Sequence, residues 1–511
     1  MPPSALANAP PSVSTSVLPS GLAGLDTILK GGLLPGRAYQ VRGRPGTGKT
    51  ILGWHFLAAP GLADTDSGPS LLITFDEPAD QLRADAEQFG FGPSTAEILD
   101  LSPTSETFFD QGNPDSFYGS SNLSLGPIAE KVTSTVEALD PTRIVVDSMS
   151  HFRQFIADTG EERMQTLSFL RYLKEKDATV LLLSEQRAPA EENLNYLSDG
   201  IIELERGPSG RTLQVQKQRG RGFRDGTHAL VIDETGMSVH PRLEPTDQGT
   251  SEVGSIFSTG VPALDELLSG GIENNTVTMI SGPSGVGKTT LGLQVLKEAA
   301  GRGQPGALLS FEEEEAVLLR RSRQVNIPIQ EMIDRGTLSV HQFRPWSFEP
   351  GTFAHCVRQL ATAETEIVML DALDGYRECG PPEQIRQQLH RLCRYLVEND
   401  VTVLLINETR AITGTFEATE WGISHLADNL LFLRYLEMEG ELRKAIGMLK
   451  KRAGEFEKTL REFEIGAYGI RVGEPLSQLR GILSGTPEWT ERPRGVSGDG
   501  QGAGTSLHVS E

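Results

Sequence analysis

The chain has 511 residues, with 47 Lys and Arg against 69 Asp and Glu, which gives a net charge of −22. This length predicts two or three domains, and the hydrophobic fraction of 38% suffices for two cores. No apolar run approaches the roughly 18 to 20 residues of a membrane helix. The acidity opposes binding to a nucleic-acid backbone over the surface as a whole, although it leaves room for a local basic strip, and it is also typical of adaptation to a salty interior.

The N-terminal region and the cysteines indicate the compartment. Residues 1–17 are rich in Pro, Ser and Ala, and we expect them to be disordered. They hold no charged segment before an apolar stretch, so we expect no secretion signal. Cys356, Cys379 and Cys393 form no CxxC pair, which favours a reducing environment, thiols that fill space, and no structural zinc. We therefore expect a cytoplasmic protein that is not bound to a membrane.

Two segments, 43–50 and 282–289, fit the pattern G-x-x-x-x-G-K-[ST] of a phosphate-binding loop. Glycines let backbone N–H groups point at phosphates, and the following helix N-terminus adds partial positive charge. The lysines are expected to reach the β- and γ-phosphates and the next threonines to bind Mg²⁺. Two matches in one local context argue against a chance glycine-rich turn, so the sequence predicts two sites for ATP or a close relative. The predicted nucleotide-binding residues are Gly43, Gly46, Thr47, Gly48, Lys49 and Thr50, then Gly282, Ser284, Gly285, Val286, Gly287, Lys288, Thr289 and Thr290.

The surroundings of the two loops repeat as well. The lead-in at 21–33 recurs at 260–272 with the same spacing of Gly, Leu, Asp and Gly-Gly, whereas the spacing drifts after the loops. This pattern is typical of a duplicated domain with later insertions, among them a surface loop at 111–124 that is special to the first copy. The predicted organisation is a first domain at 18–239, a linker at 240–254, a second domain at 255–490 and a disordered tail at 491–511.

Each repeat alternates short apolar runs with amphipathic stretches. This predicts an α/β fold in which a mainly parallel, twisted sheet is flanked by helices. Ligands of such sheets bind at the carboxyl ends of the strands, so polar residues there are candidates for a site. The predicted strands are 71–75, 144–146 and 179–183 in the first repeat, and 307–311, 367–370 and 401–406 in the second.

Acidic residues follow two of these strands in each repeat. Asp147 and Asp371 are expected to bind Mg²⁺, directly or through water, opposite Thr50 and Thr289, and the alternative is that they cap helices. A second pair of acids in each repeat could polarise the attacking water or hydroxyl, and its alternative is a solvated helix start that the helix dipole favours. The shorter side chain in the first repeat predicts that the two sites differ in rate. These candidate catalytic acids are Asp76, Glu77, Glu312 and Glu313.

A strand near the end of each repeat alternates apolar and polar residues and ends in Lys-x-Arg. In the first repeat the alternation places Leu213, Val215, Lys217 and Arg219 on one face, and the second repeat has the same pattern. Such cations either solubilise a sheet edge or carry positive charge to the γ-phosphate of a neighbouring subunit, which is worth about 10³ to 10⁵ in rate. Recurrence favours the second interpretation, which requires a ring or filament. The four cations are Lys217, Arg219, Lys450 and Arg452.

Together these features resemble the KaiC family, the double-domain RecA-type ATPases of the bacterial circadian clock and their bacterial and archaeal relatives. The resemblance runs from about 18 to 487 and includes the lead-ins, both loops, the acidic strand ends, the Lys-x-Arg strands and the tail at 482–487. It is closest at 423–446. It implies two tandem RecA-like P-loop domains and a homo-hexamer of two stacked rings, with ATP and Mg²⁺ at the subunit interfaces. It also implies a slow ATPase in the first ring and a Ser/Thr autokinase and autophosphatase in the second.

Carried over by position, the resemblance makes Glu312 the kinase general base with Glu313 beside it, and Ser424 the phosphoacceptor. A plain turn serine is the alternative for Ser424. His425 stands where the clock proteins have a neighbouring acceptor threonine, so the ordered two-site cycle is not expected, and Thr419 is a candidate substitute. The further departures are Ala372 and Ala453, where the family usually has Ser and Gly.

The leading hypothesis is therefore a KaiC-like ATPase with serine autokinase activity that acts as a nucleotide- or phosphorylation-switched regulator of unidentified protein partners. One alternative is a DNA-dependent recombinase or helicase of the same fold. It needs a basic surface, for which 219–224 is the best candidate. The other is a ring that ATP stabilises without turnover. Adenine rather than guanine follows only from the resemblance.

Overall fold

The computed structural model divides into two compact units, Met1–Leu243 with Glu349–Cys356 (unit 1) and Glu244–Phe348 with Val357–Glu511 (unit 2). The residues that the structure describes are 17–60, 68–103, 125–152, 159–185, 191–207, 210–244, 255–344, 350–361, 365–409, 422–438, 440–452, 454–477, 479–480 and 488–489. The predicted loop at 111–124, the candidate Thr419, the departure at Ala453 and the tail at 482–487 lie outside them. So do residues 245–254 of the predicted linker, residues 1–16 and the predicted tail at 491–511.

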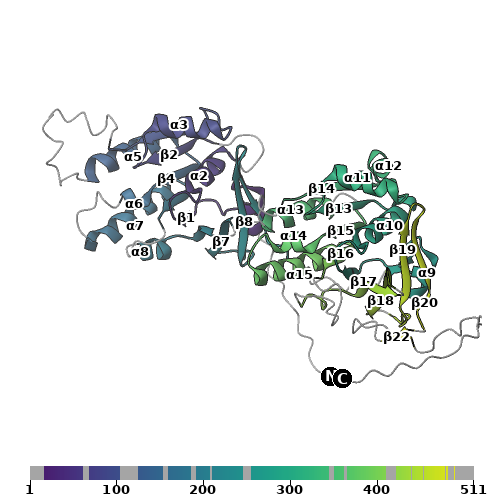
Figure 1. The fold of residues 1–511 in the computed structure, drawn as a ribbon. Coiled ribbons are helices and arrows are strands. Elements are labelled where there is room, and N and C mark those ends of the chain that lie inside the picture. The colour runs from purple at the N-terminus through teal and green to yellow at the C-terminus, as the bar shows by residue number, and fades with distance from the viewer. Residues whose placement is uncertain are drawn as a thin grey trace, which may run out of the picture. The chain divides into compact units, whose positions relative to one another are not determined.

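Unit 1 is built on a nine-stranded sheet in the order β3-β2-β4-β5-β1-β6-β7-β8-β9 (Figure 1). The strands from β3 to β6 in this order pair in parallel, and β6 to β9 form antiparallel hairpins. The strands are β1 (Ala38–Gly43), β2 (Ser70–Thr74), β3 (Glu97–Asp100), β4 (Arg143–Asp147), β5 (Thr179–Ser184), β6 (Gly200–Gly207), β7 (Gly210–Gln218), β8 (Thr227–Asp233) and β9 (Gly236–His240).

Helices cover both faces of this sheet, because alternate side chains of its central strands enter two different cores. Leu72 and Val145 belong to one core with Leu52 and Phe56 of α2, while Ile73 and its neighbours pack with α5 and α7. Continuous apolar strands buried on both faces are typical of a parallel sheet. The helices are α1 (Ala23–Ile28), α2 (Lys49–Ala58), α3 (Ala79–Gln88), α5 (Leu125–Leu139), α6 (Met149–Phe152), α7 (Thr159–Glu175) and α8 (Glu191–Leu197).

Unit 2 repeats this topology with the strand order β14-β13-β15-β16-β12-β17-β18-β19-β20, and two small antiparallel sheets of two strands, β10-β11 and β21-β22, accompany it. The strands are β10 (Ile256–Phe257), β11 (Ile272–Glu273), β12 (Val277–Gly282), β13 (Gly306–Ser310), β14 (Leu338–Gln342), β15 (Ile367–Asp371), β16 (Thr402–Glu408), β17 (Asn429–Met438), β18 (Glu441–Lys451), β19 (Arg461–Gly466), β20 (Gly469–Pro475), β21 (Leu479–Arg480) and β22 (Glu488–Trp489). The helices along this part of the chain are α9 (Pro262–Leu267), α10 (Lys288–Gly301), α11 (Glu315–Gln324), α12 (Ile329–Asp334), α13 (Pro350–Ala361), α14 (Leu373–Arg377) and α15 (Pro382–Glu398).

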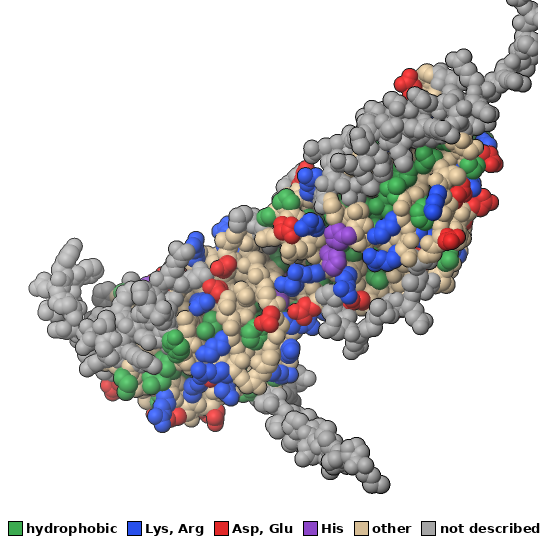
Figure 2. Space-filling model, turned by 90° about the horizontal axis from the view of Figure 1, so that it is seen from below, with side chains coloured by type: hydrophobic (Ala, Val, Ile, Leu, Met, Phe, Trp, Pro, Cys, Tyr) green, Lys and Arg blue, Asp and Glu red, His purple; other side chains and the backbone are tan. Residues whose placement is uncertain are grey.

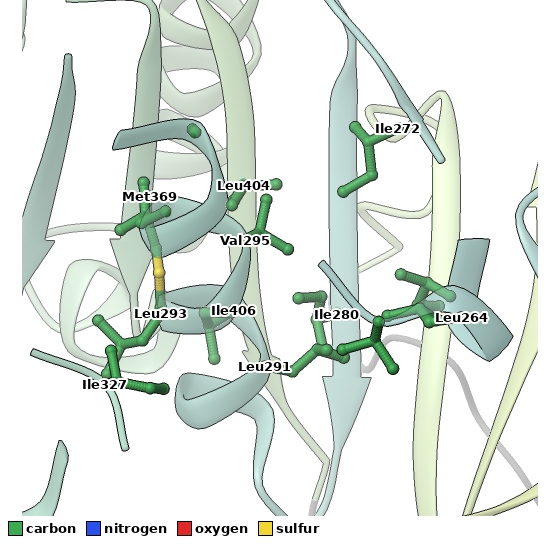
Figure 3. Packing of buried hydrophobic residues seen from close by; sticks show 14 of the residues in the cluster. Leu264, Ile272, Ile280, Leu291, Leu293, Val295, Ile327, Met369, Leu404 and Ile406 are labelled. Carbon is green, nitrogen blue, oxygen red and sulfur yellow. The ribbon is translucent and has the colours of Figure 1, made fainter. Parts of the chain in front are cut away.

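Helix α10 packs against the centre of the unit 2 sheet. Its residues Leu291, Leu293 and Val295 share one core with Met369 of β15 and Ile406 of β16 (Figure 3). This packing fixes the start of α10 over the carboxyl end of β12, where a phosphate-binding loop has to lie. The two sheets confirm the predicted fold of tandem RecA-like α/β domains, and all six predicted strands are present, each displaced by at most two residues at an end.

Candidate nucleotide-binding sites

In each unit the glycine-rich loop joins the central strand to a helix, β1 to α2 and β12 to α10. Gly48 and Gly287 cap these helices in the left-handed region, at φ 102° and 117°. Side chains rarely adopt this conformation. A Cβ atom would also lie 2.5 Å from Ile232 Cδ1 in the first loop and 2.3 Å from Ile465 Cδ1 in the second. Backbone conformation and packing therefore both require the last glycine of the motif.

Both loop lysines fold back onto their own loop. Lys49 Nζ donates to Gly43 O at 2.8 Å, and Lys288 Nζ donates to Pro283 O at 2.9 Å. Lys288 Nζ also lies 3.4 Å from Glu408 Oε2. Burial lowers the pKa of Lys288, although the negative charge of Glu408 opposes this. The ammonium groups therefore lie within the loops, where a phosphate could replace the carbonyl oxygens as their partner.

The predicted magnesium ligands meet in both units. Thr50 Oγ1 donates to Asp147 Oδ2 at 2.8 Å, and Thr289 Oγ1 donates to Asp371 Oδ1 at 3.1 Å. Burial raises the pKa of Asp147 and raises the pKa of Asp371 to about 6, because a buried carboxylate without a cation is poorly solvated. A hydroxyl and a carboxylate oxygen beside a phosphate loop fit Mg²⁺, which keeps several waters and takes few protein ligands. Across the described residues no cluster of three or more His, Cys, Asp or Glu could hold a metal by itself.

In unit 2 the two candidate catalytic acids differ in their partners. Glu313 forms an ion pair with Arg321 at 2.8 Å. Glu312 lies among other acids, and its pKa is raised by partial burial first and then by Glu408 and Asp371. Burial raises the pKa of Glu313 as well, although the charge of Arg321 opposes this. The two acids therefore differ in their neighbours, since Glu313 has a cation beside it and Glu312 has other acids.

Unit 1 arranges its acids differently. Asp76 Oδ1 lies 3.6 Å from His151 Nε2, and the Asp76 side chain is 55% exposed. Glu77 is the acid whose pKa is raised, by burial first and then by Asp147 and Asp76. Asp85 occupies the position on α3 that Arg321 has on α11, and its charge also raises the pKa of Glu77. Burial and neighbouring acids therefore raise the pKa of Glu77 in unit 1, as they raise that of Glu312 in unit 2.

The predicted common face of the Lys-x-Arg strands is wrong. A bulge between Ile201 and Ile202 makes Val215 pair with Ile202 but Lys217 pair with Ile201. Directly paired residues share a face and consecutive residues alternate, so Lys217 lies on the opposite face from Val215. Unit 2 has the same bulge between Leu430 and Leu431, with the same consequence for its lysine. An inserted residue shifts the alternation by one, which a strict period of two does not anticipate.

The four cations contact the segments that precede β6 and β17, which are the end of α8 with Ser198 in unit 1 and the turn that ends at Asp428 in unit 2. Lys217 Nζ donates to Asn195 O and Ser198 O, both at 2.7 Å, and Lys450 Nζ donates to Ala427 O at 2.6 Å. The arginines remain more exposed, with 52% of the Arg219 side chain and 64% of the Arg452 side chain accessible. They bond to Tyr196 O at 3.2 Å and to Asp428 Oδ1 at 2.8 Å, respectively.

These cations lie at the end of the sheet where the parallel strands begin, whereas their own phosphate loop lies where the strands end. The Arg219 amide donates to Asp199 O, which precedes β6, whereas Gly43 at the loop pairs with Leu204. Five residues of strand separate the two levels, which is about 16 Å. An arginine side chain is too short to span that distance, so Arg219 cannot act on the loop of its own unit. The register of Lys450 with Leu430 places the unit 2 cations at the same edge.

The candidate phosphoacceptor lies in the turn that Lys450 contacts. Lys450 Nζ donates to Ser424 O at 3.3 Å, and Ser424 itself is half-buried. His425 is exposed and donates its Nδ1–H to Gly422 O at 2.7 Å, because a carbonyl oxygen can only accept. Its ring lies 6.2 Å from that of His390 on α15, with 28° between the planes. The structure therefore brings Ser424 next to the Lys-x-Arg strand of its own unit.

Sequence reasoning missed side chains that contact the phosphate loops from the neighbouring hairpins. Arg211 Nε donates to Gly46 O at 3.4 Å, and Lys444 Nζ donates to Gly285 O at 3.3 Å. Arg211 and Lys444 each lie six residues before the lysine of Lys-x-Arg, so the contact is duplicated together with the domain. The Tyr435 hydroxyl adds a bond to Ser284 O at 3.4 Å. Glu408, which pairs with Lys288, was missed as well. The shared spacing of Arg211 and Lys444 was the only available signal.

The face in Figure 2 carries charged residues of both signs. On the face in Figure 2, acidic side chains interrupt the Lys and Arg side chains, and histidines lie beside several of the cations. Burial lowers the pKa of His390, and so do the charges of Arg394, His425 and Arg391. Arg394 in turn pairs with Glu398 at 3.3 Å.

None of the helices in the described part of the chain combines the length and apolar character that a membrane crossing requires.

Two sheets of RecA order, each with a phosphate loop after its central strand and an acid opposite the loop threonine, define a tandem P-loop NTPase. Comparison with known proteins agrees. The family model described as "ATPase: KaiC" matches residues 18–244 and 257–477. The chain belongs to this KaiC ATPase family.

Relatives resemble this chain over nearly its whole length. The "Circadian clock oscillator protein KaiC" of Prochlorococcus marinus is 27% identical over an alignment of 496 positions, and the match covers 92% of this chain and 95% of that protein. The protein of the same name from Acaryochloris marina is 26% identical over 91% of this chain and 90% of its own length. The "Circadian clock protein KaiC3" of Synechocystis sp. is 25% identical, with 93% and 95% covered.

Proposed function

We propose that this protein hydrolyses Mg²⁺-ATP in both units and that unit 2 also transfers phosphate to a serine of its own chain. The observation that carries the proposal is the duplicated set of loop lysine, loop threonine and buried acid, which has the same hydrogen bond in both units. Adenine is taken from the family to which the chain belongs.

Each residue has a chemical role at the site. Lys49 and Lys288 would hold the β- and γ-phosphates, and the threonine–aspartate pairs would hold Mg²⁺, which would neutralise charge on the phosphates. Glu312 accepts the proton of the attacking hydroxyl or water in unit 2, and Glu77 is the better placed acid in unit 1, by its raised pKa. Burial of these carboxyl groups brings their pKa values closer to neutrality, where a general base is most effective.

The Lys-x-Arg cations act on the nucleotide of a neighbouring subunit. They lie about 16 Å along the strand from their own loop, so a role at a phosphate requires another chain. Two stacked rings of six subunits, as the family resemblance implies, would supply such a neighbour for each unit. The partial exposure of Arg219 and Arg452 leaves their guanidinium groups accessible for this contact.

Ser424 is the proposed phosphoacceptor, with Thr419 as the second candidate. Ser424 supports this role because it lies in the turn that Lys450 contacts, so the cation and the acceptor would approach the same neighbouring phosphate. His425 beside it removes the second hydroxyl of the clock cycle. Phosphorylation of this turn would switch the protein's contacts with signalling partners through added negative charge.

The proposal is tested with γ-labelled ATP and the purified full chain. Free phosphate and protein-bound label are followed together in the wild type and in Ser424→Ala. We expect free phosphate from both proteins and bound label only on the wild type. Label that persists on Ser424→Ala at the wild-type level would move the acceptor elsewhere. Phosphate release without any label would contradict the kinase activity, and neither product would contradict the ATPase.

A further inference from the structure

Glu408 occupies a fixed position beside the second phosphate loop. It is the last residue of β16, where it pairs in register with Gly282, the first glycine of the loop. The next amide, of Thr409, donates to Gly282 O at 3.1 Å, and the Glu408 amide donates to Asp374 Oδ2 at 3.3 Å. The backbone on both sides of the Glu408 side chain is therefore tied to the loop strand and to α14.

The contact between Glu408 and Lys288 joins a buried cation to a more accessible anion. The Lys288 side chain is 6% exposed and that of Glu408 is 36% exposed, with 3.4 Å between Nζ and Oε2. A buried ammonium is strongly disfavoured without a counter-charge, and Pro283 O supplies only a neutral acceptor. Glu408 is therefore placed to neutralise Lys288 in the form of the protein without nucleotide.

The same lysine has to contact phosphate when nucleotide binds. Glu408 and the γ-phosphate would then compete for one ammonium, and the displaced carboxylate would remain near a group of its own sign. Glu312, Asp371 and Asp374 lie near the same place: burial raises the pKa of Glu312, and the charges of Glu408, Asp371 and Asp374 raise it further. In unit 1 the residue that matches Glu408 is Glu185, and its amide donates to Ser150 Oγ at 3.1 Å, so a hydroxyl stands there where unit 2 has the carboxylate of Asp374.

We propose that Glu408 is a positioning residue that holds Lys288 in the empty second site and that a nucleoside triphosphate has to displace. This rests on the proposed function, since it assumes that the second loop binds nucleotide. Glu408 consequently weakens binding of nucleotide to unit 2 and stabilises the empty unit. When nucleotide leaves unit 2, Glu408 pairs with Lys288 again. This pairing favours release and leaves the site ready to bind another nucleotide.

The test measures nucleotide affinity directly, in the full chain that carries Lys49→Ala to silence the first loop. ATP with Mg²⁺ is titrated by calorimetry into this protein and into the same protein with Glu408→Gln. We expect affinity to rise about three- to tenfold, the effect of losing one partly exposed ion pair that competes with the ligand. Glu408→Asp keeps the charge but shortens the side chain by one methylene, so its affinity should lie between the two.

A matched control removes a charge elsewhere on unit 2. Glu331→Gln on α12 breaks an exposed pair with Arg335 at 3.5 Å, and it should leave the affinity unchanged. The nucleotide-free protein supplies a second readout. Its melting temperature should fall in Glu408→Gln, because Lys288 loses its counter-charge, and saturating ATP should restore it.

The outcomes separate this inference from the proposed function. Unchanged or weaker binding by Glu408→Gln, with the fold intact by circular dichroism and the parent binding ATP, would overturn the role of Glu408. An increase of the same size in Glu331→Gln would also overturn it, since net charge alone would then suffice. A parent protein with no measurable binding at the second loop would instead refute the proposed nucleotide site.

Discussion

Arg143 makes the stability of unit 1 depend on one buried cation. It is the first residue of β4, and its side chain is fully buried. Its Nη1 donates to Pro19 O and Phe56 O, both at 2.9 Å, and its Nη2 donates to Pro60 O at 2.6 Å. The guanidinium also lies 4.9 Å from the centre of the Phe56 ring. One side chain thus joins the N-terminal segment to the end of α2, the helix that starts at the first phosphate loop.

The perturbation is Arg143→Leu, which leaves three carbonyl oxygens without their donor. Each hydrogen bond from a charged donor contributes about 1.5–3 kcal/mol, and the cost of burying the guanidinium offsets part of the sum. Burial lowers the pKa of Arg143 to about 10, which indicates that this cost is substantial. We therefore expect a net loss of about 3–5 kcal/mol in the unfolding free energy of unit 1. Arg143→Lys should lose about 1–3 kcal/mol, since an ammonium cannot span all three acceptors.

Differential scanning calorimetry of the full chain measures this loss. Unit 2 is the internal reference, because Ile367 occupies the matching first position of β15. Arg171→Leu is the matched control, since its pair with Glu175 is exposed and should contribute less than about 1 kcal/mol. An Arg143→Leu protein that unfolds within about 0.5 kcal/mol of the wild type would refute the reasoning. If Arg143→Lys were as stable as the wild type, the hydrogen bonds of the guanidinium to three separate carbonyl oxygens would not be needed for stability.

Three further predictions concern the sites. Burial raises the pKa of Asp371 to about 6 and only the carboxylate binds a cation, so Mg²⁺ affinity at unit 2 should fall about tenfold as the pH drops from 7 to 5, by titration calorimetry with nucleotide. Glu312→Gln should lower phosphate release or transfer by unit 2 about 10²- to 10⁴-fold without loss of nucleotide affinity. Glu313→Gln should have a smaller effect, because Arg321 already pairs with that carboxylate. Equal effects of the two variants would contradict the assignment of Glu312 as the general base. Arg452→Ala should lower turnover in unit 2 by about 10³-fold, and mixing it with a loop-lysine variant should restore activity only if the arginine acts on a neighbouring subunit.

Features that depend on local chemistry could be predicted from the sequence. The loop glycines, Lys49 and Thr50 follow a fixed spacing because the backbone has to curl around phosphate, and buried strands show as apolar runs. Asp147 could be placed opposite Thr50 because parallel strands end at a common edge, and the 2.8 Å bond between them confirms this. Because the pattern is duplicated, Asp371 could be placed opposite Thr289 in unit 2 by the same reasoning.

Features that depend on pairing between distant segments could not be predicted. The bulge that turns Lys217 to the other face is one inserted residue, and no local pattern distinguishes it from regular alternation. Glu408 and Arg211 reach the loops from strands far away in the sequence, so their roles follow from sheet order alone. The difference between Asp76 and Glu77 comes from neighbours such as His151, which only the folded chain brings close.

The central claim is that each unit binds one nucleotide through its own phosphate loop. Native mass spectrometry of the full chain with a slowly hydrolysed ATP analogue and Mg²⁺ counts bound nucleotides most directly. The account predicts two nucleotides per chain in the wild type, and one in each of Lys49→Ala and Lys288→Ala. A count of one or none in the wild type, or no loss in either variant, would contradict it.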